Sequence, residues 1–317
     1  MRLRLFAVLA VLSMTALAQQ YPAKPVRIVV PSSPGGASDL VTRIVTTVLG
    51  ERLGQSFVVE NRVTSGGIIG TQQVAESAPD GYTLLGTFDT FAINPYLFKG
   101  LKWDPVRDFA PLMQICRYPQ VLVVHPSLGV KTVREFVALA KEKGASLNYG
   151  SAGPASSSRL AYELFKDTAG IETVPVHYKG GGPAIQDLLS GQVQVMLIQG
   201  GGAIPQYVKT GKLVALAVSS LERSKFYPEL PTIAETYPGF ETESWVGLFA
   251  PAQTPREILE RLHAELDKVI SEPAMKEKLE TQGCDVVGGA AATLAARVKS
   301  DQAKWSRLIR EKNITVQ

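Results

Sequence analysis

Short runs of β-branched residues alternate with amphipathic segments from Pro25 onward, and this alternation constrains the fold of the 317-residue chain most strongly. It is typical of βαβ units, in which helices cover a largely parallel sheet. The predicted strands span residues 26–30, 57–60, 82–85, 121–124, 147–149, 174–177, 193–198, 213–218 and 246–250. Apolar residues recur at helical spacing between Ser38 and Leu53. The predicted fold class is α/β.

The chain is long enough for two domains, and no low-complexity linker separates them. We therefore expect two lobes joined by crossings within residues 119–125 and 216–220, with a ligand cleft between the lobes. This division places residues 21–120 plus 229–317 in lobe 1 and residues 121–228 in lobe 2. Each lobe is expected to contain a mostly parallel sheet flanked by helices.

Residues 1–18 have the pattern of an export signal. Arg2 and Arg4 precede a short apolar stretch, and Ala16-Leu17-Ala18 fits a cleavage site after Ala18. The apolar stretch is shorter than a membrane-spanning helix, which disfavours an anchor. We expect a periplasmic protein. An oxidising compartment permits a disulfide between Cys116 and Cys284, and the sequence leaves open whether they form one or remain free thiols.

Charge and motifs exclude several functions. Lys and Arg total 33 against 29 Asp and Glu, too small an excess to indicate a nucleic-acid surface. The sequence contains no phosphate-binding glycine motif, no nucleophile elbow and no metal-binding histidine motif, and its three histidines are isolated. We expect no metal, no cofactor and no nucleic-acid partner.

Two glycine- and serine-rich turns stand out, at residues 31–39 and 150–158, one in each expected lobe. Each precedes a predicted helix, whose first amides lack intrahelical partners and carry the positive end of the helix dipole. Such turns are suited in principle to binding an anion, although glycine, serine and proline are also normal residues of ordinary turns. The candidate ligand-binding residues are Ser33, Gly35, Gly36, Ala37, Ser38, Asp39, Thr87, Gly150, Ser151, Ser156, Ser157, Arg159, Tyr178 and Gln199.

Two of these candidates carry charge. A carboxylate would repel a bound anion, so Asp39 is interpreted as a first-turn helix residue that reaches a ligand only through water. Arg159 is either a bidentate partner of a ligand carboxylate or a solvated surface residue.

Several motifs resemble the Bug family, the TctC-like solute receptors of tripartite tricarboxylate transporters. They include Pro34-Gly35-Gly36 with Asp39, Pro79-Asp80-Gly81-Tyr82, Tyr178-Lys179-Gly180-Gly181-Gly182-Pro183 and Leu248-Phe249-Ala250-Pro251. The resemblance covers residues 21–317. It implies a two-lobe, type II-like periplasmic binding protein that closes on a di- or tricarboxylate, an acidic amino acid or an aromatic acid and passes it to membrane subunits. It also implies that the two turns hold the carboxylate through backbone amides, hydroxyls and ordered waters, without catalysis.

The chain departs from the family pattern at three places. Ser32-Ser33 replaces a segment that often starts with an aromatic residue, Arg159 replaces a frequent His, and Gln199 replaces a common Asp or Asn. A cationic Arg159 and a neutral Gln199 would favour anions, so we expect a specificity different from that of well-known relatives.

Two other functions remain open. A sensor that presents ligand to a membrane signalling protein would share every binding residue with a transport receptor. An enzyme on the same scaffold would need a poised acid or base, for which Asp39, Asp89, His125 and His177 are unsupported candidates. A receptor that hinges is expected to be a monomer.

Overall fold

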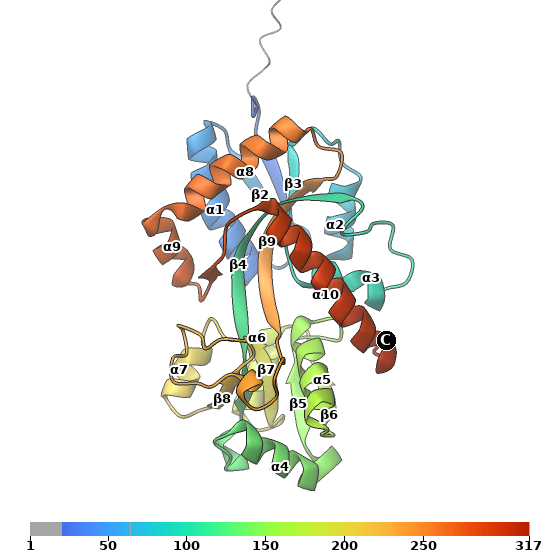
Figure 1. The fold of residues 1–317 in the computed structure, drawn as a ribbon, viewed down its shortest axis with the longest axis vertical. Helices are drawn as coiled ribbons and strands as arrows, with labels where there is room; N and C mark the ends of the chain where they lie inside the picture. The colour runs from blue at the N-terminus through green and yellow to red at the C-terminus, as the bar shows by residue number, and fades with distance from the viewer. Residues whose placement is uncertain (1–20, 64, 317) are drawn as a thin grey trace, which may run out of the picture.

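A computed structural model describes residues 21–63 and 65–316, so the expected export signal and its cleavage site lie outside the described residues. The described chain forms two lobes joined by two long strands (Figure 1). The elements of the upper lobe in this view, lobe 1, are β1 (Val26–Val30), α1 (Ala37–Leu53), β2 (Phe57–Asn61), α2 (Ile68–Ala75), β3 (Thr83–Phe88), α3 (Thr90–Leu97), α8 (Arg256–Ser271), α9 (Pro273–Glu280), β10 (Asp285–Val286) and α10 (Ala291–Glu311).

The lower lobe, lobe 2, contains α4 (Val133–Lys143), β5 (Asn148–Ser151), α5 (Ser157–Ala169), β6 (Val174–His177), α6 (Gly181–Leu189), β7 (Val195–Gln199), α7 (Ile204–Lys209) and β8 (Val214–Val218). The two long strands are β4 (Phe109–Val124) and β9 (Glu243–Pro251). Short 3-10 turns cover Ser65–Gly67, Pro126–Leu128, Gly144–Ser146 and Ile233–Glu235.

The strand order is β2-β1-β3-β9-β4-β7-β5-β6, and β8 and β10 each pair with β4. The strands that belong to βαβ units are parallel: β1 pairs with β2 and β3, and β5 pairs with β6 and β7. By contrast, β4 and β9 run antiparallel to their neighbours. The chain must enter lobe 2 along one strand and return along another, so an antiparallel pair interrupts the otherwise parallel pattern.

β4 changes partners where it leaves lobe 1. Its register with β9 ends at Pro119, and its register with β7 begins at Gln120. Buried hydrogen bonds tie this point to the returning chain: Ser219 N donates to Gln120 O at 2.8 Å, and Thr242 N donates to Ser219 O at 3.0 Å.

The packing of the returning chain bears on one expected lobe boundary. Ile233 and Phe240, which the expected division placed in lobe 1, pack in the core of lobe 2 with residues such as Leu122 and Phe165. We therefore propose that lobe 2 extends to Thr242, where the chain turns into β9, while the first boundary stays at Gln120.

The C-terminal helix α10 also connects the lobes. Trp305, Leu308 and Ile309 of this helix form one buried cluster with Ile93 of α3 and Leu160 of α5. Figure 1 shows α10 running from lobe 1 toward α5. This apolar contact adds a third link between the lobes.

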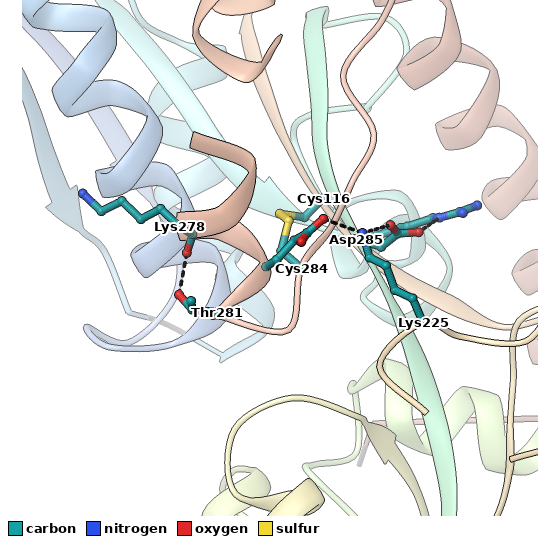
Figure 2. The surroundings of a disulfide bond; sticks show 8 residues. Cys116, Lys225, Lys278, Thr281, Cys284 and Asp285 are labelled. Carbon is teal, nitrogen blue, oxygen red and sulfur yellow. Dashed lines mark hydrogen bonds and ion pairs between the residues drawn. A yellow bond between two sulfur atoms is a disulfide. The ribbon is translucent and has the colours of Figure 1, made fainter. Parts of the chain in front are cut away.

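A disulfide joins Cys116 of β4 to Cys284, which follows α9, and so settles the question that the sequence left open. Both residues are fully buried in the core of lobe 1. Figure 2 shows the bridge with Lys225 and Asp285 beside it. Lys225 pairs with Asp285 at 3.1 Å and with Glu280 at 2.6 Å, so the segment fixed by the disulfide also contacts the chain that follows β8.

Candidate functional site

A cavity of about 630 Å³ lies between the lobes, within the usual size range of small-molecule sites. From lobe 1 and the crossing strands it is lined by Ser32, Gly35, Gly36, Ala37, Ser38, Leu40, Phe88, Thr90, Tyr118, Gln120, Ser244, Val246, Thr281 and Gln282. From lobe 2 it is lined by Ala152, Ser156, Ser157, Ser158, Gly181, Gly182, Ile185, Ile198, Gln199, Gly201, Gly202, Ala203 and Ile204.

The lobe 1 turn presents the first amides of α1 to the cavity. Gly35 adopts a positive φ of 79°, and Gly36 precedes the helix in an extended conformation without a side-chain cap. Asp39 holds this turn from behind, because its carboxylate accepts from Gly35 N at 2.9 Å and from the Arg43 guanidinium at 2.9 Å. Burial opposes the charge on Asp39, but these donors and Asn61 outweigh it and lower the pKa of this carboxyl.

The lobe 2 turn presents the first amides of α5 and is held by hydroxyl groups. The Ser156 hydroxyl caps the helix by accepting from Arg159 N at 3.3 Å. The Ser158 hydroxyl accepts from Ala152 N at 3.0 Å, and Ser151 hydrogen-bonds to His177 Nδ1 at 2.7 Å. The Ser157 hydroxyl also hydrogen-bonds to the carboxylate of Asp89, which belongs to lobe 1.

Two further helices of eight or more residues begin at the cavity. Thr90 is the first residue of α3, and Gly181 and Gly182 open α6 after Gly180, whose φ is +130°. The N-termini of α1, α3, α5 and α6 therefore converge on one space, two from each lobe. Their unpaired amides and dipoles create a positive potential there without any cationic side chain.

The sheet provides the floor of the cavity. Phe88 pairs with Val246, and Tyr118 pairs with Ser244, so these side chains lie in rows on one face. Tyr118 is 1% exposed, and its hydroxyl has no hydrogen-bond partner in the described structure. Burial raises the pKa of this phenol above its usual range, so Tyr118 is a neutral group in the cavity wall.

The disulfide-linked segment forms one edge of the cavity. Thr281 and Gln282 line it, and they come two or three residues before Cys284. Gly283 lies close to Gly201 of lobe 2, since a Cβ on Gly283 would meet the Gly201 Cα at 3.1 Å. The two lobes are thus in contact at this edge.

Half of the predicted site residues line the cavity: Gly35, Gly36, Ala37, Ser38, Ser156, Ser157 and Gln199. The others do not. Ser33 is exposed, Asp39 and Ser151 are buried behind their turns, Thr87 lies within β3, and Gly150 packs near Met196. The Tyr178 hydroxyl donates to Asp187 at 2.6 Å.

The sequence left Arg159 as either a ligand partner or a solvated surface residue, and the structure places it away from the cavity lining. Its guanidinium donates to the carbonyls of Pro154 at 2.7 Å and Thr315 at 2.6 Å. Pro154 lies in the turn before α5, whereas Thr315 follows α10 and is thereby held beside the start of α5. Arg159 therefore connects the C-terminal segment to lobe 2 and does not line the cavity.

The candidate acids and bases of an enzyme also lie off the cavity. His125 contacts Ser127, and burial together with the Arg159 charge lowers the pKa of His177. Burial and the nearby Asp301 charge raise the pKa of Asp89 to about 7, although the hydroxyls of Ser244 and Ser157 and the charge of Arg297 oppose this. No cluster of His, Cys, Asp or Glu suited to a metal occurs among residues 21–63 and 65–316.

Tyr118, Ser244 and Gln120 were not predicted as site residues from the sequence. They lie in buried strands, and the sequence pattern of such strands indicates core residues. The only available signal was their place beside the strand end at the lobe crossing. In the described part of the chain, no helix combines the length and hydropathy needed to cross a membrane.

Comparisons with known proteins agree with this architecture. The profile of the tripartite tricarboxylate transporter family receptor, TctC, matches residues 41–314. The UPF0065 protein in the tcbD-tcbE intergenic region of a Pseudomonas species is 38% identical over 92% of this chain and 87% of its own length. Protein BugT of Bordetella pertussis is 32% identical over 97% of each chain.

Solved structures show the same fold. The periplasmic binding protein BugD superposes with a TM-score of 0.80 at 32% identity, over 94% of this chain and all of its own. An R. palustris protein with adipate gives 0.83 at 32% identity, over 93% and 99% of the two chains. MatC from Rhodopseudomonas palustris with bound malate gives 0.79 at 31% identity, over 91% and 100%. This chain therefore belongs to the TctC family of receptors, which includes the Bug proteins.

Proposed function

We propose that the protein is an extracytoplasmic receptor that binds a small carboxylate in the interlobe cavity and delivers it to a tripartite tricarboxylate-type transporter. The observation that carries this proposal is the convergence of four helix N-termini, two from each lobe, on a cavity with no charged side chain in its lining. Backbone amides at helix N-termini bind anions without further assistance.

Ligand contact from both lobes also explains how binding favours closure. A carboxylate that accepts from α1 and α5 together binds the closed arrangement more tightly than an open one, so it shifts the population toward closure. Closure removes water and strengthens each amide contact, because the local dielectric falls. The neutral wall leaves these amides as the main attraction for an anion.

The relatives support the ligand class and the compartment. Two family members were solved with adipate and malate, which are both dicarboxylates. BugD is a periplasmic binding protein, and residues 1–18 have the composition of an export signal. We propose a periplasmic monomer that acts with membrane subunits and converts nothing. An enzyme would need a proton-transferring side chain at the cavity, and the candidates Asp39, Asp89, His125 and His177 do not line it.

The test is calorimetric titration of the mature chain after unfolding and refolding, which removes any ligand from the expression host. The probes are adipate, malate, glutarate and 3-phenylpropanoate, and NMR checks each acid after incubation. Saturable binding of an unchanged acid supports the proposal. If none of the acids binds, or if one is consumed, the proposal is wrong.

A backbone variant tests the helix N-terminus directly. Proline is favoured at the first position of a helix, where it removes one amide donor at little cost to folding. Ala37→Pro removes a donor at the cavity, and Ala291→Pro is the matched control at the start of α10. We expect Ala37→Pro to weaken binding about tenfold or more and the control to leave it unchanged. Equal affinities for the two variants would contradict a role for the α1 amides.

A further inference from the structure

The turn before α5 is tied to the segment that follows α10. Arg159 Nη1 donates to the Pro154 carbonyl at 2.7 Å and to the Thr315 carbonyl at 2.6 Å. Pro154 lies midway between Ala152 and Ser156, which both line the cavity. One guanidinium therefore connects the lobe 2 wall of the cavity to a segment that arrives from lobe 1.

The end of α10 fixes the position of this segment. Asn313 adopts a positive φ of 49°, a conformation that asparagine tolerates and that often ends helices. Ile314 N donates to the Ile309 carbonyl at 3.0 Å, and Asn313 N donates to the Arg310 carbonyl at 3.4 Å. These two bonds form a Schellman motif, which turns the chain sharply at the end of a helix. The Thr315 carbonyl follows this turn, so the local structure of α10 sets where it lies.

Apolar packing holds the same segment against α5. Ile314 is 7% exposed and belongs to one buried cluster with Leu160 of α5. Val316 packs against this cluster, and so does Ala155 of the turn before α5. Burial of these side chains removes apolar surface from water and favours the docked segment. Residues 314–316 thus contact both the helix and the turn that precedes it.

Arg159 and residues 314–316 lie outside the cavity lining, so they reach a ligand only through the backbone that they hold. The first amides of α5 begin at Ser157, three residues after the carbonyl that Arg159 binds. A hydrogen bond weakens steeply when its angle departs from linear, so these amides must be correctly aligned to bind an anion well. A turn that is already fixed also loses little conformational freedom when the ligand arrives.

We propose that Arg159 is a positioning residue for the ligand site, and that it acts with residues 314–316 to hold the first amides of α5 in place for the ligand. The inference rests on the proposed function, since it assumes that these amides bind an acid. It implies that residues 314–316 influence ligand affinity from outside the cavity.

Two substitutions test the inference by calorimetry on the refolded mature chain, with adipate, malate, glutarate and 3-phenylpropanoate as probes. Arg159→Ala removes both hydrogen bonds, and Ile314→Ala loosens the segment that carries the Thr315 carbonyl without changing any charge. We expect Arg159→Ala to weaken binding about fivefold and Ile314→Ala about threefold. Arg307→Ala is the matched control, because Arg307 is an exposed residue of α10 that pairs with Glu311. This control should keep the wild-type affinity.

The double variant separates a shared effect from two independent ones. Because both substitutions disrupt one interaction, Arg159→Ala/Ile314→Ala should bind about as strongly as Arg159→Ala alone, whereas independent effects would multiply to about 15-fold. Hydrogen exchange of the ligand-free protein gives a second measurement: the Ser157 and Ser158 amides should exchange faster in both single variants than in the wild type or the control.

Unchanged affinity in either single variant, or losses that multiply in the double variant, would overturn the inference and leave the proposed function intact. If Arg159→Ala does not fold, the affinity of Ile314→Ala decides, since that variant keeps the guanidinium. Absence of binding of all four acids by the wild type would overturn the proposed function and this inference with it.

Discussion

The two walls of the cavity present helix N-termini in the same way but are held by different chemistry. In lobe 1, a buried carboxylate paired with Arg43 holds the turn before α1, and a disulfide holds the segment that carries Thr281 and Gln282. In lobe 2, the serine hydroxyls of residues 151, 156 and 158 hold the turn before α5. Under the proposed function, the carboxylate of Asp39 is compatible with anion binding because Arg43 neutralises its charge and it lies behind the cavity wall.

This comparison predicts that lobe 1 depends on a few strong interactions and lobe 2 on several weak ones. Single substitutions should therefore have larger effects on the lobe 1 wall than on the lobe 2 wall.

The disulfide should give the largest effect. It links residues 168 positions apart, so its removal should lower the free energy of unfolding by about 4 kcal/mol. Urea unfolding of the Cys116→Ala/Cys284→Ala variant measures this loss, and reduction of the wild type should reproduce most of it. Reductant should not affect the variant. A variant as stable as the oxidised wild type would show that the bridge does not support the lobe 1 wall.

Asp89 should give the next largest effect, because it lies where the two walls meet. Burial raises its pKa to about 7, above the value of 3.8 expected in an unfolded chain, so its protonated form favours folding. This contribution is fully present at low pH and is lost as the pH rises through about 7. Between about pH 5 and pH 9, the wild type should lose about 2 kcal/mol of stability that Asp89→Asn does not lose. Denaturant unfolding measures both proteins across this pH range. Unfolding free energies that change with pH in the same way in both would contradict the raised pKa of Asp89.

Asp39 and Ser156 allow a direct comparison of the two turns. Asp39→Ala should cost about 2 kcal/mol of unfolding free energy, because it removes hydrogen bonds to a charged acceptor, whereas Ser156→Ala removes a neutral helix cap and should cost about 1 kcal/mol. The lowered pKa of Asp39 means that its contribution is present above the unfolded pKa and is lost as the pH falls through the folded value. The loss of unfolding free energy caused by Asp39→Ala should therefore become smaller at acidic pH, while the loss caused by Ser156→Ala should not change. Equal losses of unfolding free energy for the two variants at neutral pH would contradict the proposed difference between the two turns.

The smallest effect is expected for Tyr118. Its hydroxyl has no partner, so Tyr118→Phe should leave the unfolding free energy unchanged or raise it by up to about 1 kcal/mol. Tyr227 is the matched control in lobe 2, because its buried hydroxyl donates to the Gly200 carbonyl, and Tyr227→Phe should cost about 1 kcal/mol. Denaturant unfolding compares the two, and equal losses would mean that the Tyr118 hydroxyl is already satisfied.

Local chemistry accounts for the parts of the structure that the sequence could predict. Each expected strand overlaps an observed strand, because short β-branched runs bounded by turn residues encode strands locally. Residues 109–120, the first 12 of the 16 residues of β4, were missed because Pro111, Arg117 and Pro119 interrupt the strand pattern. Its pairing with β9, more than a hundred residues later, stabilises this segment instead.

The same distinction applies to the site. Both turns could be predicted from the glycine and serine residues before α1 and α5, because these residues are favoured where helices begin. The floor residues Tyr118 and Ser244 depend on strand pairing between distant segments, which no local pattern shows. The contact of Arg159 with the Thr315 carbonyl could not be predicted from a local pattern, because Thr315 is 156 residues away in sequence.

A crystal structure of the refolded chain with adipate, or with the tightest-binding acid of the panel, tests the central claim most directly. We predict that one carboxylate accepts hydrogen bonds from amides of both the 35–38 and the 156–158 segments. A carboxylate held by a cationic side chain such as Arg159, or by the amides of only one lobe, would contradict the account.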